Sequence, residues 1–350
     1  MREKPPYASF DSPMKFQAIQ GIIARRLREH PKAICSYSGG SDSDILIDLL
    51  ERSRKMFNLA PIKYVFFNTG LEMKATKRHV RETAEKYGVE IEEIRPKKGI
   101  VTAVREYGIP FISKQMSLDL HYVQKYKVPF SIAWEFQQAE DKKAKLKEFQ
   151  ERYNIKHHPI TFLCSCNSDA EPICTQTTIS CAPYLLDFLN ENPIPFRVSD
   201  QCCSVCKKRP SHEAQKGYEV VITGERIAEG GVRSIHKDRS CFDEQRDGTY
   251  RMRPLFYVSD RDKAWYKNEF GIRYSDAYEV YGLKRTGCTG CPINAKATEE
   301  LERIAKYEPQ LAKAAWNVFG ASYEYRRKYN EYKAMRRAEE KRDKDQISMC

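Results

Sequence analysis

The sequence predicts an α/β protein in which helices cover a parallel sheet. Short apolar runs alternate with amphipathic stretches at helical spacing over residues 14–94, which is typical of strand–helix–strand units. Two polar, glycine-containing segments, Ser38–Ser43 and Asn68–Gly70, each follow a predicted strand. Both segments should therefore lie at the carboxyl ends of parallel strands, where such sheets bind their ligands.

The individual elements follow from periodicity and from breaker residues. In the first third of the chain we expect a helix at 14–29, a strand from Ala33, a helix after Gly40, a strand at 62–67, a helix at 74–87 and a strand at 90–94. The remainder should be mostly helical over 97–150 and 184–189, with a strand at 218–223, a helix from Ser259 and helices beyond Pro292.

These elements divide the chain into three expected regions. Residues 1–32 form an N-terminal helix, and residues 33–260 form a nucleotide-binding domain with a cysteine-rich insertion near 160–206. Residues 261–350 form a helical C-terminal region that also carries a Cys-x-x-Cys pair.

Composition favours a cytoplasmic protein without a membrane segment. The polar opening Met1–Pro6 does not resemble a signal peptide, and no apolar run is long enough to span a bilayer. The 350 residues carry a formal net charge of +12. Basic clusters at 326–328 and 336–337 alternate with tyrosines, which suits either a nucleic-acid face or, more simply, a solvated helix of mixed charge.

The segment Ser38-Gly39-Gly40-Ser41-Asp42-Ser43 is the strongest candidate site. A glycine-rich turn between a strand and a helix leaves backbone N–H groups free at the helix N-terminus, where they bind phosphate. Asp42 would repel a phosphate unless Mg²⁺ bridged the two charges. A turn capped by serine and aspartate is the simpler alternative, but the flanking strand and helix favour a phosphate site.

Twelve cysteines are many for a cytosolic chain, and their spacing suggests metal binding rather than disulfides. The tandem Cys202-Cys203-x-x-Cys206 and the later Cys288-x-x-Cys291 suit an iron–sulfur cluster, with zinc as the alternative. A second group could hold another metal or could simply be buried thiols, and it comprises Cys164, Cys166, Cys174 and Cys181. Cys35, inside the first strand, should be a core residue.

The set of motifs, in order, resembles the phosphoadenosine-phosphosulfate (PAPS) reductase family. This family lies within the adenine-nucleotide alpha hydrolases, which are HUP-like, Rossmann-like domains with a pyrophosphate loop. The matching segments span residues 33–294 and are Ser38–Ser43, Asn68–Glu72, Tyr107–Pro110 with Ser113-Lys114, Cys202–Lys207, Gly224–Arg226 with Arg233, Arg253–Leu255 with Trp265, and Tyr281-Gly282 with Gly287–Pro292.

The resemblance implies a [4Fe–4S] cluster on Cys203, Cys288, Cys291 and one of Cys202 or Cys206. It also implies an adenine nucleotide with Mg²⁺, bound by Ser38, Gly39, Gly40, Ser41, Asp42, Ser43, Asn68, Thr69 and Gly70. The implied catalytic residues are Asp42, Lys114, Arg226 and Arg233, the last three stabilising developing charge.

Two departures separate this chain from the sulfonucleotide reductases. Those enzymes usually have a degenerate loop, whereas this chain keeps the full Ser-Gly-Gly-x-Asp-Ser, and their C-terminal Cys-Gly-x-His motif is absent although Cys350 ends the chain. We therefore expect an ATP-dependent, adenylating sulfur-transfer enzyme, with a PAPS or adenylyl-sulfate reductase as the alternative. The expected partners are a sulfur donor or thiol reductant and further copies of the chain as a homo-oligomer, with a nucleic acid as one candidate for the acceptor, which the sequence does not name.

Overall fold

The computed structural model describes residues 4–155, 184–230 and 240–347. The chain divides into two compact units. The first comprises Met1–Gly99, Val205–Thr289 and Arg303–Leu311, and the second comprises Ile100–Ser204, Gly290–Glu302 and Ala312–Cys350. Each unit is described by itself.

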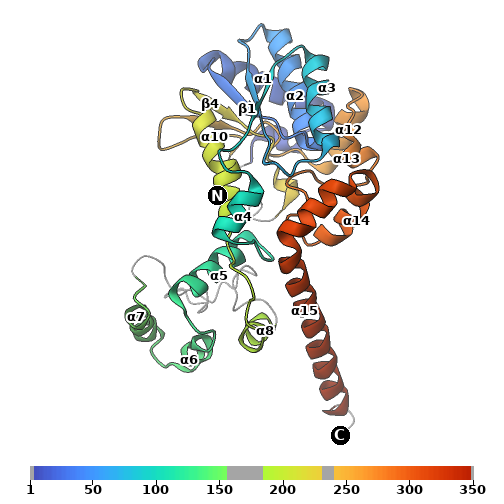
Figure 1. Cartoon of the computed structure of the whole chain (residues 1–350). Helices are drawn as coiled ribbons and strands as arrows, with labels where there is room; N and C mark the ends of the chain where they lie inside the picture. Colours follow the sequence, from blue (N-terminus) through green and yellow to red (C-terminus); the bar gives the residue numbers. More distant parts are fainter. Residues whose placement is uncertain (1–3, 156–183, 231–239, 348–350) are drawn as a thin grey trace. The chain divides into compact units, whose positions relative to one another are not determined.

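A six-stranded, mostly parallel sheet forms the centre of the first unit (Figure 1). Its order is β3-β2-β1-β4-β6-β5, and only β5 runs antiparallel to its neighbour. The strands are β1 (Ala33–Ser36), β2 (Lys63–Phe67), β3 (Ile91–Ile94), β4 (Val220–Ile222), β5 (Phe242–Glu244) and β6 (Tyr250–Met252). The strand order reverses between β1 and β4, so the carboxyl ends of these two strands form the switch point where ligands bind in such sheets.

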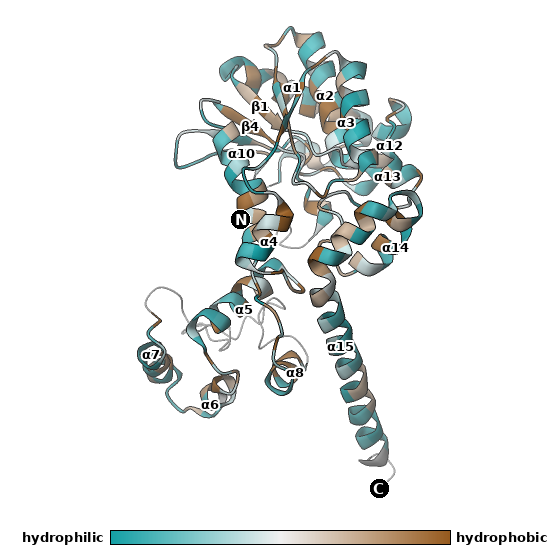
Figure 2. Cartoon of the chain, in the orientation of Figure 1, coloured by the Kyte–Doolittle hydropathy of each residue, from teal (hydrophilic) through white to brown (hydrophobic). Residues whose placement is uncertain are grey.

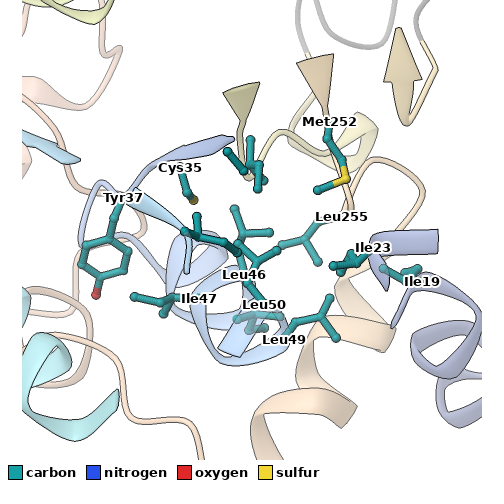
Figure 3. Packing of buried hydrophobic residues seen from close by; sticks show 14 of the residues in the cluster. Ile19, Ile23, Cys35, Tyr37, Leu46, Ile47, Leu49, Leu50, Met252 and Leu255 are labelled. Atoms are coloured by element: carbon teal, nitrogen blue, oxygen red, sulfur yellow. The ribbon is translucent and has the colours of Figure 1, made fainter. Parts of the chain in front are cut away.

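Both faces of this sheet are buried, as a parallel sheet requires. Cys35 packs into the larger core with Leu46 and Ile23 from the helices (Figure 3). The neighbouring Ile34 packs on the opposite face with Val65 and Val221. Cys35 is 1% exposed, which confirms the prediction that it is a core residue. Burial raises the pKa of its thiol.

The helices of the first unit are α1 (Ser12–Glu29), α2 (Ser41–Phe57), α3 (Lys74–Tyr87), α10 (Arg209–Ala214), α12 (Asp260–Glu269) and α13 (Asp276–Glu279). The bounds of α1 and α3 and the starts of α2 and α12 lie close to the predicted positions, whereas α10 and α13 were not predicted. The apolar side predicted for α1 is buried at Phe16, Ile19, Ile23 and Leu27. The hairpin of β5 and β6 was not expected, because three-residue strands are too short to give a periodic signal.

The second unit is helical and contains α4 (Ile100–Tyr107), α5 (Lys114–Tyr126), α6 (Ile132–Gln138), α7 (Lys142–Arg152), α8 (Leu185–Glu191) and α9 (Gln201–Cys203). Two further helices include residues of both units, namely α14 (Ala297–Tyr307) and the 39-residue α15 (Pro309–Ile347). Tyr325 and Tyr329 of α15 are buried against Phe188 in the core of the second unit. These two tyrosines are therefore unavailable to stack on nucleic-acid bases.

The far end of α15 is hydrophilic (Figure 2), and its exposed charges are mixed, with ion pairs such as Arg336–Glu339. This matches the simpler expectation of a solvated helix. Among the helices that the structure describes, none is both long and apolar enough to cross a membrane.

Candidate active site

Gly39 shapes the turn that leads from β1 into α2. Its φ is +65°, in the left-handed region that side-chain-bearing residues rarely adopt. A Cβ at this position would also lie 2.9 Å from Cγ2 of Thr76 on α3, closer than carbon atoms normally approach. The first glycine of the loop is therefore required both by backbone conformation and by contact with α3.

The second glycine and Ser43 hold the loop against the first turn of α2. The Gly40 backbone N–H donates to Ser43 Oγ over 3.1 Å, and that hydroxyl donates to the Gly40 carbonyl oxygen over 2.8 Å. Ser38 Oγ lies 2.8 Å from the same Ser43 oxygen. These contacts fix the loop beside the N-terminus of a 17-residue helix, the geometry that favours phosphate binding.

A buried polar network ties the first turn of α2 to α3. Asp44, 3% exposed, accepts hydrogen bonds at Oδ1 from the Tyr37 hydroxyl over 2.5 Å, and His79 Nε2 lies 2.9 Å from the same oxygen. The Tyr37 hydroxyl is also 3.0 Å from Thr83 Oγ1. Burial, followed by the Asp44 charge, raises the pKa of Tyr37, so this residue stays a neutral donor.

The loop after β4 places Arg226 against Asp42. Arg226 Nε donates to Asp42 Oδ1 over 2.9 Å, and its Nη2 lies 2.9 Å from Asp260 Oδ1. Only 5% of the Arg226 side chain is exposed. Burial lowers the pKa of this arginine, but the charge of Asp42 and the hydrogen bonds to both aspartates outweigh burial, and the net pKa is raised.

Lys263 of α12 is a second cation at the loop. Its Nζ lies 2.5 Å from Asp42 Oδ1 and donates to Ser41 Oγ over 2.6 Å. Asp42 is therefore paired with two cations, in addition to any role toward a metal ion. Lys263 could not be recognised from the sequence, because it lies 221 positions after Asp42 in an ordinary amphipathic helix with no recognisable motif around it.

The loop, the end of β4 and the segment before Cys288 line a cavity of about 570 Å³ within the first unit, which is open to solvent on one side. The predicted residues that line it are Ser38, Gly40, Ser41, Asp42, Ser43 and Arg226. The other lining residues are Ser36, Thr223, Gly224, Glu225, Glu229, Lys263, Tyr278, Lys284, Arg285 and Thr286. A cavity with hydroxyls, free helix N–H groups and several cations suits a polyphosphate.

The segment Asn68–Gly70 does not line this cavity. The Asn68 side chain donates to Glu93 Oε1 over 3.0 Å and accepts from the Gly70 N–H over 3.0 Å. The Thr69 hydroxyl donates to Glu72 over 2.9 Å and lies 3.4 Å from Sγ of Cys288. In the ligand-free chain, this segment therefore supports the Cys288 loop.

The two remaining predicted catalytic cations are placed differently. Lys114 is exposed and is the first residue of α5, in the second unit. Arg233 lies outside the described residues.

In the first unit, two of the candidate cluster thiols have defined surroundings. Cys206 is fully buried, and its thiol donates to the Lys98 carbonyl oxygen over 3.3 Å. It lies in a π-helical turn, Ser204–Lys208, a distortion often found at functional sites. Cys288 is partly exposed, and the Thr289 N–H donates to the Leu71 carbonyl oxygen over 2.9 Å.

In the second unit, α15 holds the loop of Cys291. The Tyr323 hydroxyl donates to the Gly290 carbonyl oxygen, and Arg326 Nη1 donates to the carbonyl oxygens of Pro292 over 2.9 Å and Asn294 over 3.3 Å. Cys202 is buried and Cys203 is partly exposed, both in α9.

Within the described ranges, no group of three or more His, Cys, Asp or Glu side chains is arranged to hold a metal ion. Cys164, Cys166, Cys174, Cys181 and Cys350 lie outside those ranges.

The fold and this site define an α/β protein with a polar, cation-lined cavity at the switch point of a mostly parallel sheet. The chain matches the family described as the phosphoadenosine phosphosulfate reductase domain over residues 32–150 and 187–294. It belongs to that family and is an enzyme of the adenine-nucleotide alpha hydrolase group. No curated protein matches the chain in sequence.

Several solved structures are similar to the chain at low identity. The PAPS reductase of Candida auris, in a phosphate complex, is 14% identical, with 77% of this chain and 87% of that chain covered and a TM-score of 0.40. The U34-tRNA thiolase NcsA of Methanococcus maripaludis, with its [4Fe–4S] cluster, is 12% identical, covering 91% and 80%, at 0.34. The NH₃-dependent NAD synthetase of Campylobacter jejuni is 10% identical, covering 93% and 97%, at 0.36. Similarities this distant assign neither a substrate nor a cofactor to this chain.

Proposed function

We propose that the chain is an ATP-dependent, adenylating sulfur-transfer enzyme. The observation that carries this proposal is the intact loop Ser38–Ser43 at the N-terminus of α2, whose residues line a cavity with four cations, Arg226, Lys263, Lys284 and Arg285. A single sulfate or phosphate needs fewer donors than this cavity offers. The donor set suits a pyrophosphate leaving group.

In the proposed first step, an acceptor oxygen attacks the α-phosphorus of ATP. A new P–O bond forms to the acceptor, the bond between the α-phosphorus and the bridging oxygen breaks, and pyrophosphate leaves with the bonding electron pair. Arg226 and Lys263 would stabilise the negative charge that develops around the reacting α-phosphorus. A sulfur nucleophile then displaces AMP from the adenylated acceptor, which replaces the acceptor oxygen with sulfur.

Mg²⁺ fits the site through the carboxylate of Asp42, which lines the cavity. When bound there, Mg²⁺ would neutralise part of the polyphosphate charge. Arg226 and Lys263 also form ion pairs with Asp42 and neutralise part of its charge.

A [4Fe–4S] cluster is the second part of the proposal. Thiolates are the usual ligands of such clusters, and this chain offers Cys203, Cys288, Cys291 and one of Cys202 or Cys206. If only three of these thiolates bound the cluster, the fourth iron would be open to hold or deliver sulfide. The Cys-x-x-Cys loop is supported by Thr69 beside Cys288 in one unit and by Tyr323 beside Gly290 in the other.

A PAPS or adenylyl-sulfate reductase is the second candidate, favoured by the family to which the chain belongs. In that reaction a cysteine thiolate attacks the sulfur of the sulfonucleotide, the S–O bond breaks and the nucleotide leaves. A thiol reductant then releases sulfite from the sulfocysteine. The intact pyrophosphate loop is unexplained by this reaction, and we therefore rank it second.

One experiment separates the two functions. The full chain is purified without oxygen and incubated with Mg²⁺ and either ATP or adenylyl sulfate, with a thiol reductant and candidate acceptors such as transfer RNA and duplex DNA. The proposal expects acceptor-dependent release of pyrophosphate and AMP from ATP. Sulfite from adenylyl sulfate, with ATP left intact, would replace the proposal with the reductase.

A further inference from the structure

The cavity contains two kinds of cation. Arg226 and Lys263 are both paired with Asp42 in the ligand-free chain. Lys284 and Arg285 line the same cavity, are exposed, and form no ion pair with any carboxylate that the structure describes. Two adjacent cations that form no direct ion pair can bind an anion, although the cavity is also lined by the carboxylates of Asp42, Glu225 and Glu229.

The position of this pair relative to the loop follows from Thr286. A Cβ built on Gly40 would lie 3.1 Å from Thr286 Oγ1 and 3.3 Å from the hydroxyl oxygen of Tyr278. The Thr286 N–H also donates to that tyrosine hydroxyl over 3.1 Å. The segment 284–286 therefore lies directly beside Gly40, and a phosphate on the N–H groups of the loop has this segment as its neighbour.

We infer that Lys284 and Arg285 form a second phosphate subsite, which takes the phosphates of a nucleotide beyond the one at the reacting centre. These two residues then determine specificity, because they favour a nucleoside triphosphate over a monophosphate or a monoanionic adenylate. The inference rests on the proposed function and deepens it, since it names the part of the cavity that recognises the leaving group.

The number of cations in the cavity favours the polyphosphate end of a nucleotide as the group that Lys284 and Arg285 bind. An AMP phosphate on the loop would be matched by the helix N-terminus and by Arg226 and Lys263 once they turn from Asp42. A triphosphate adds two further phosphates, and Lys284 with Arg285 supplies two further positive charges. Bonds between such cations and phosphate are charge-assisted and stronger than neutral hydrogen bonds.

The test compares the wild type with the double variant Lys284→Gln/Arg285→Gln. The control variant is Lys55→Gln, which removes an exposed cation of the same unit that does not line the cavity. The affinities for ATP, AMP and adenosine 3′,5′-bisphosphate are measured by titration calorimetry at fixed salt. We expect the double variant to lose about ten- to a hundredfold in ATP affinity while its AMP and bisphosphate affinities change by less than about twofold.

Each other outcome counts against the inference. If the double variant keeps the wild-type preference for ATP over AMP, the subsite is wrong while the proposed function stands. If only the bisphosphate affinity falls, the two cations bind a phosphate on the ribose instead. If the wild type binds ATP no more tightly than AMP, the inference and the proposed function fall together. If Lys55→Gln loses as much ATP affinity as the double variant, the loss comes from the overall charge of the chain and the subsite is wrong.

Discussion

Asp42 and Arg226 join the two loops of the active site: Arg226 Nε lies 2.9 Å from Asp42 Oδ1, and this ion pair connects the loop after β1 with the loop after β4. The pair crosses the switch point of the sheet at the level where the phosphates would lie. A ligand phosphate would therefore compete with Asp42 for the same guanidinium. When a phosphate binds, Arg226 would exchange its ion pair with Asp42 for an ion pair with the ligand. The guanidinium is already buried, so binding would not have to remove water from a solvated cation.

Replacing Asp42 with asparagine should abolish most turnover while leaving the fold intact. The amide can still accept a hydrogen bond from Arg226, but it cannot hold the charges of Arg226 and Lys263 in place or bind Mg²⁺. We expect turnover at saturating ATP and Mg²⁺ to fall by about a hundredfold, with an unchanged circular dichroism spectrum. The matched control is Asp260→Asn, which removes the 80% exposed partner of Arg226 and should retain most activity. Full activity in Asp42→Asn would refute its role.

Replacing glycine with alanine should destabilise the fold when the glycine lies in the phosphate loop and stabilise it when the glycine lies inside a helix. Gly39→Ala forces alanine into a φ of +65° with its Cβ 2.9 Å from Thr76, so the free energy of unfolding should fall by about 1–3 kcal/mol. Gly21→Ala lies on the exposed side of α1 with nothing within 4 Å, and it should raise that free energy by about 0.5–1 kcal/mol. Urea denaturation measures both. Equal effects of the same sign would contradict the loop geometry.

The stability of the chain should fall in acid partly through Asp262. Burial alone would raise the pKa of this carboxyl, but hydrogen bonds from Lys15 and Ser259 hold the pKa at about 2. A depressed pKa stabilises the fold above the unfolded-state value of about 3.9, and this stabilisation, about 2 kcal/mol, is lost as the pH falls toward 2. The difference in unfolding free energy between wild type and Asp262→Asn should shrink from pH 6 to pH 3. A constant difference would rule out this ion pair as the cause.

Iron content tests the cluster independently of activity. Anaerobically purified wild type should contain about four irons and four sulfides per chain and absorb near 400 nm (about where such clusters absorb). Cys288→Ala should lose the iron, whereas Cys35→Ala, in the core of the sheet, should keep it. Stoichiometric zinc without iron would replace the cluster with a zinc site.

The sheet and the phosphate loop could be predicted from the sequence because each depends on local signals. The strand before Gly39-Gly40 and the helix after them are contiguous, and α3 begins and ends at the predicted residues 74–87. Lys263, Lys284 and Arg285 could not be found in this way. They come to the loop through tertiary packing across more than 200 positions. Lys284 and Arg285 lie between the matching segments Tyr281-Gly282 and Gly287–Pro292, but no local signal places them beside the loop.

The burial of two aromatic residues of α15 could not be predicted from the sequence either. Tyr325 and Tyr329 stand beside basic residues in the sequence, which suits a nucleic-acid face as well as a solvated helix. The structure buries both to 4% and 6% exposure, because they pack on Phe188 of a helix more than 130 positions earlier. Local composition could not reveal that partner, and only the tertiary fold decides which side of the helix is covered.

Competition between ATP and adenylyl sulfate for the wild-type cavity tests the central claim most directly, since it needs no knowledge of the acceptor. The account predicts Mg²⁺-dependent ATP binding that inorganic pyrophosphate displaces, because the loop and its cations are built for two or more phosphates. Adenylyl sulfate should bind more weakly than ATP. Tight binding of adenylyl sulfate with no detectable binding of ATP would contradict the account and make the chain a sulfonucleotide reductase.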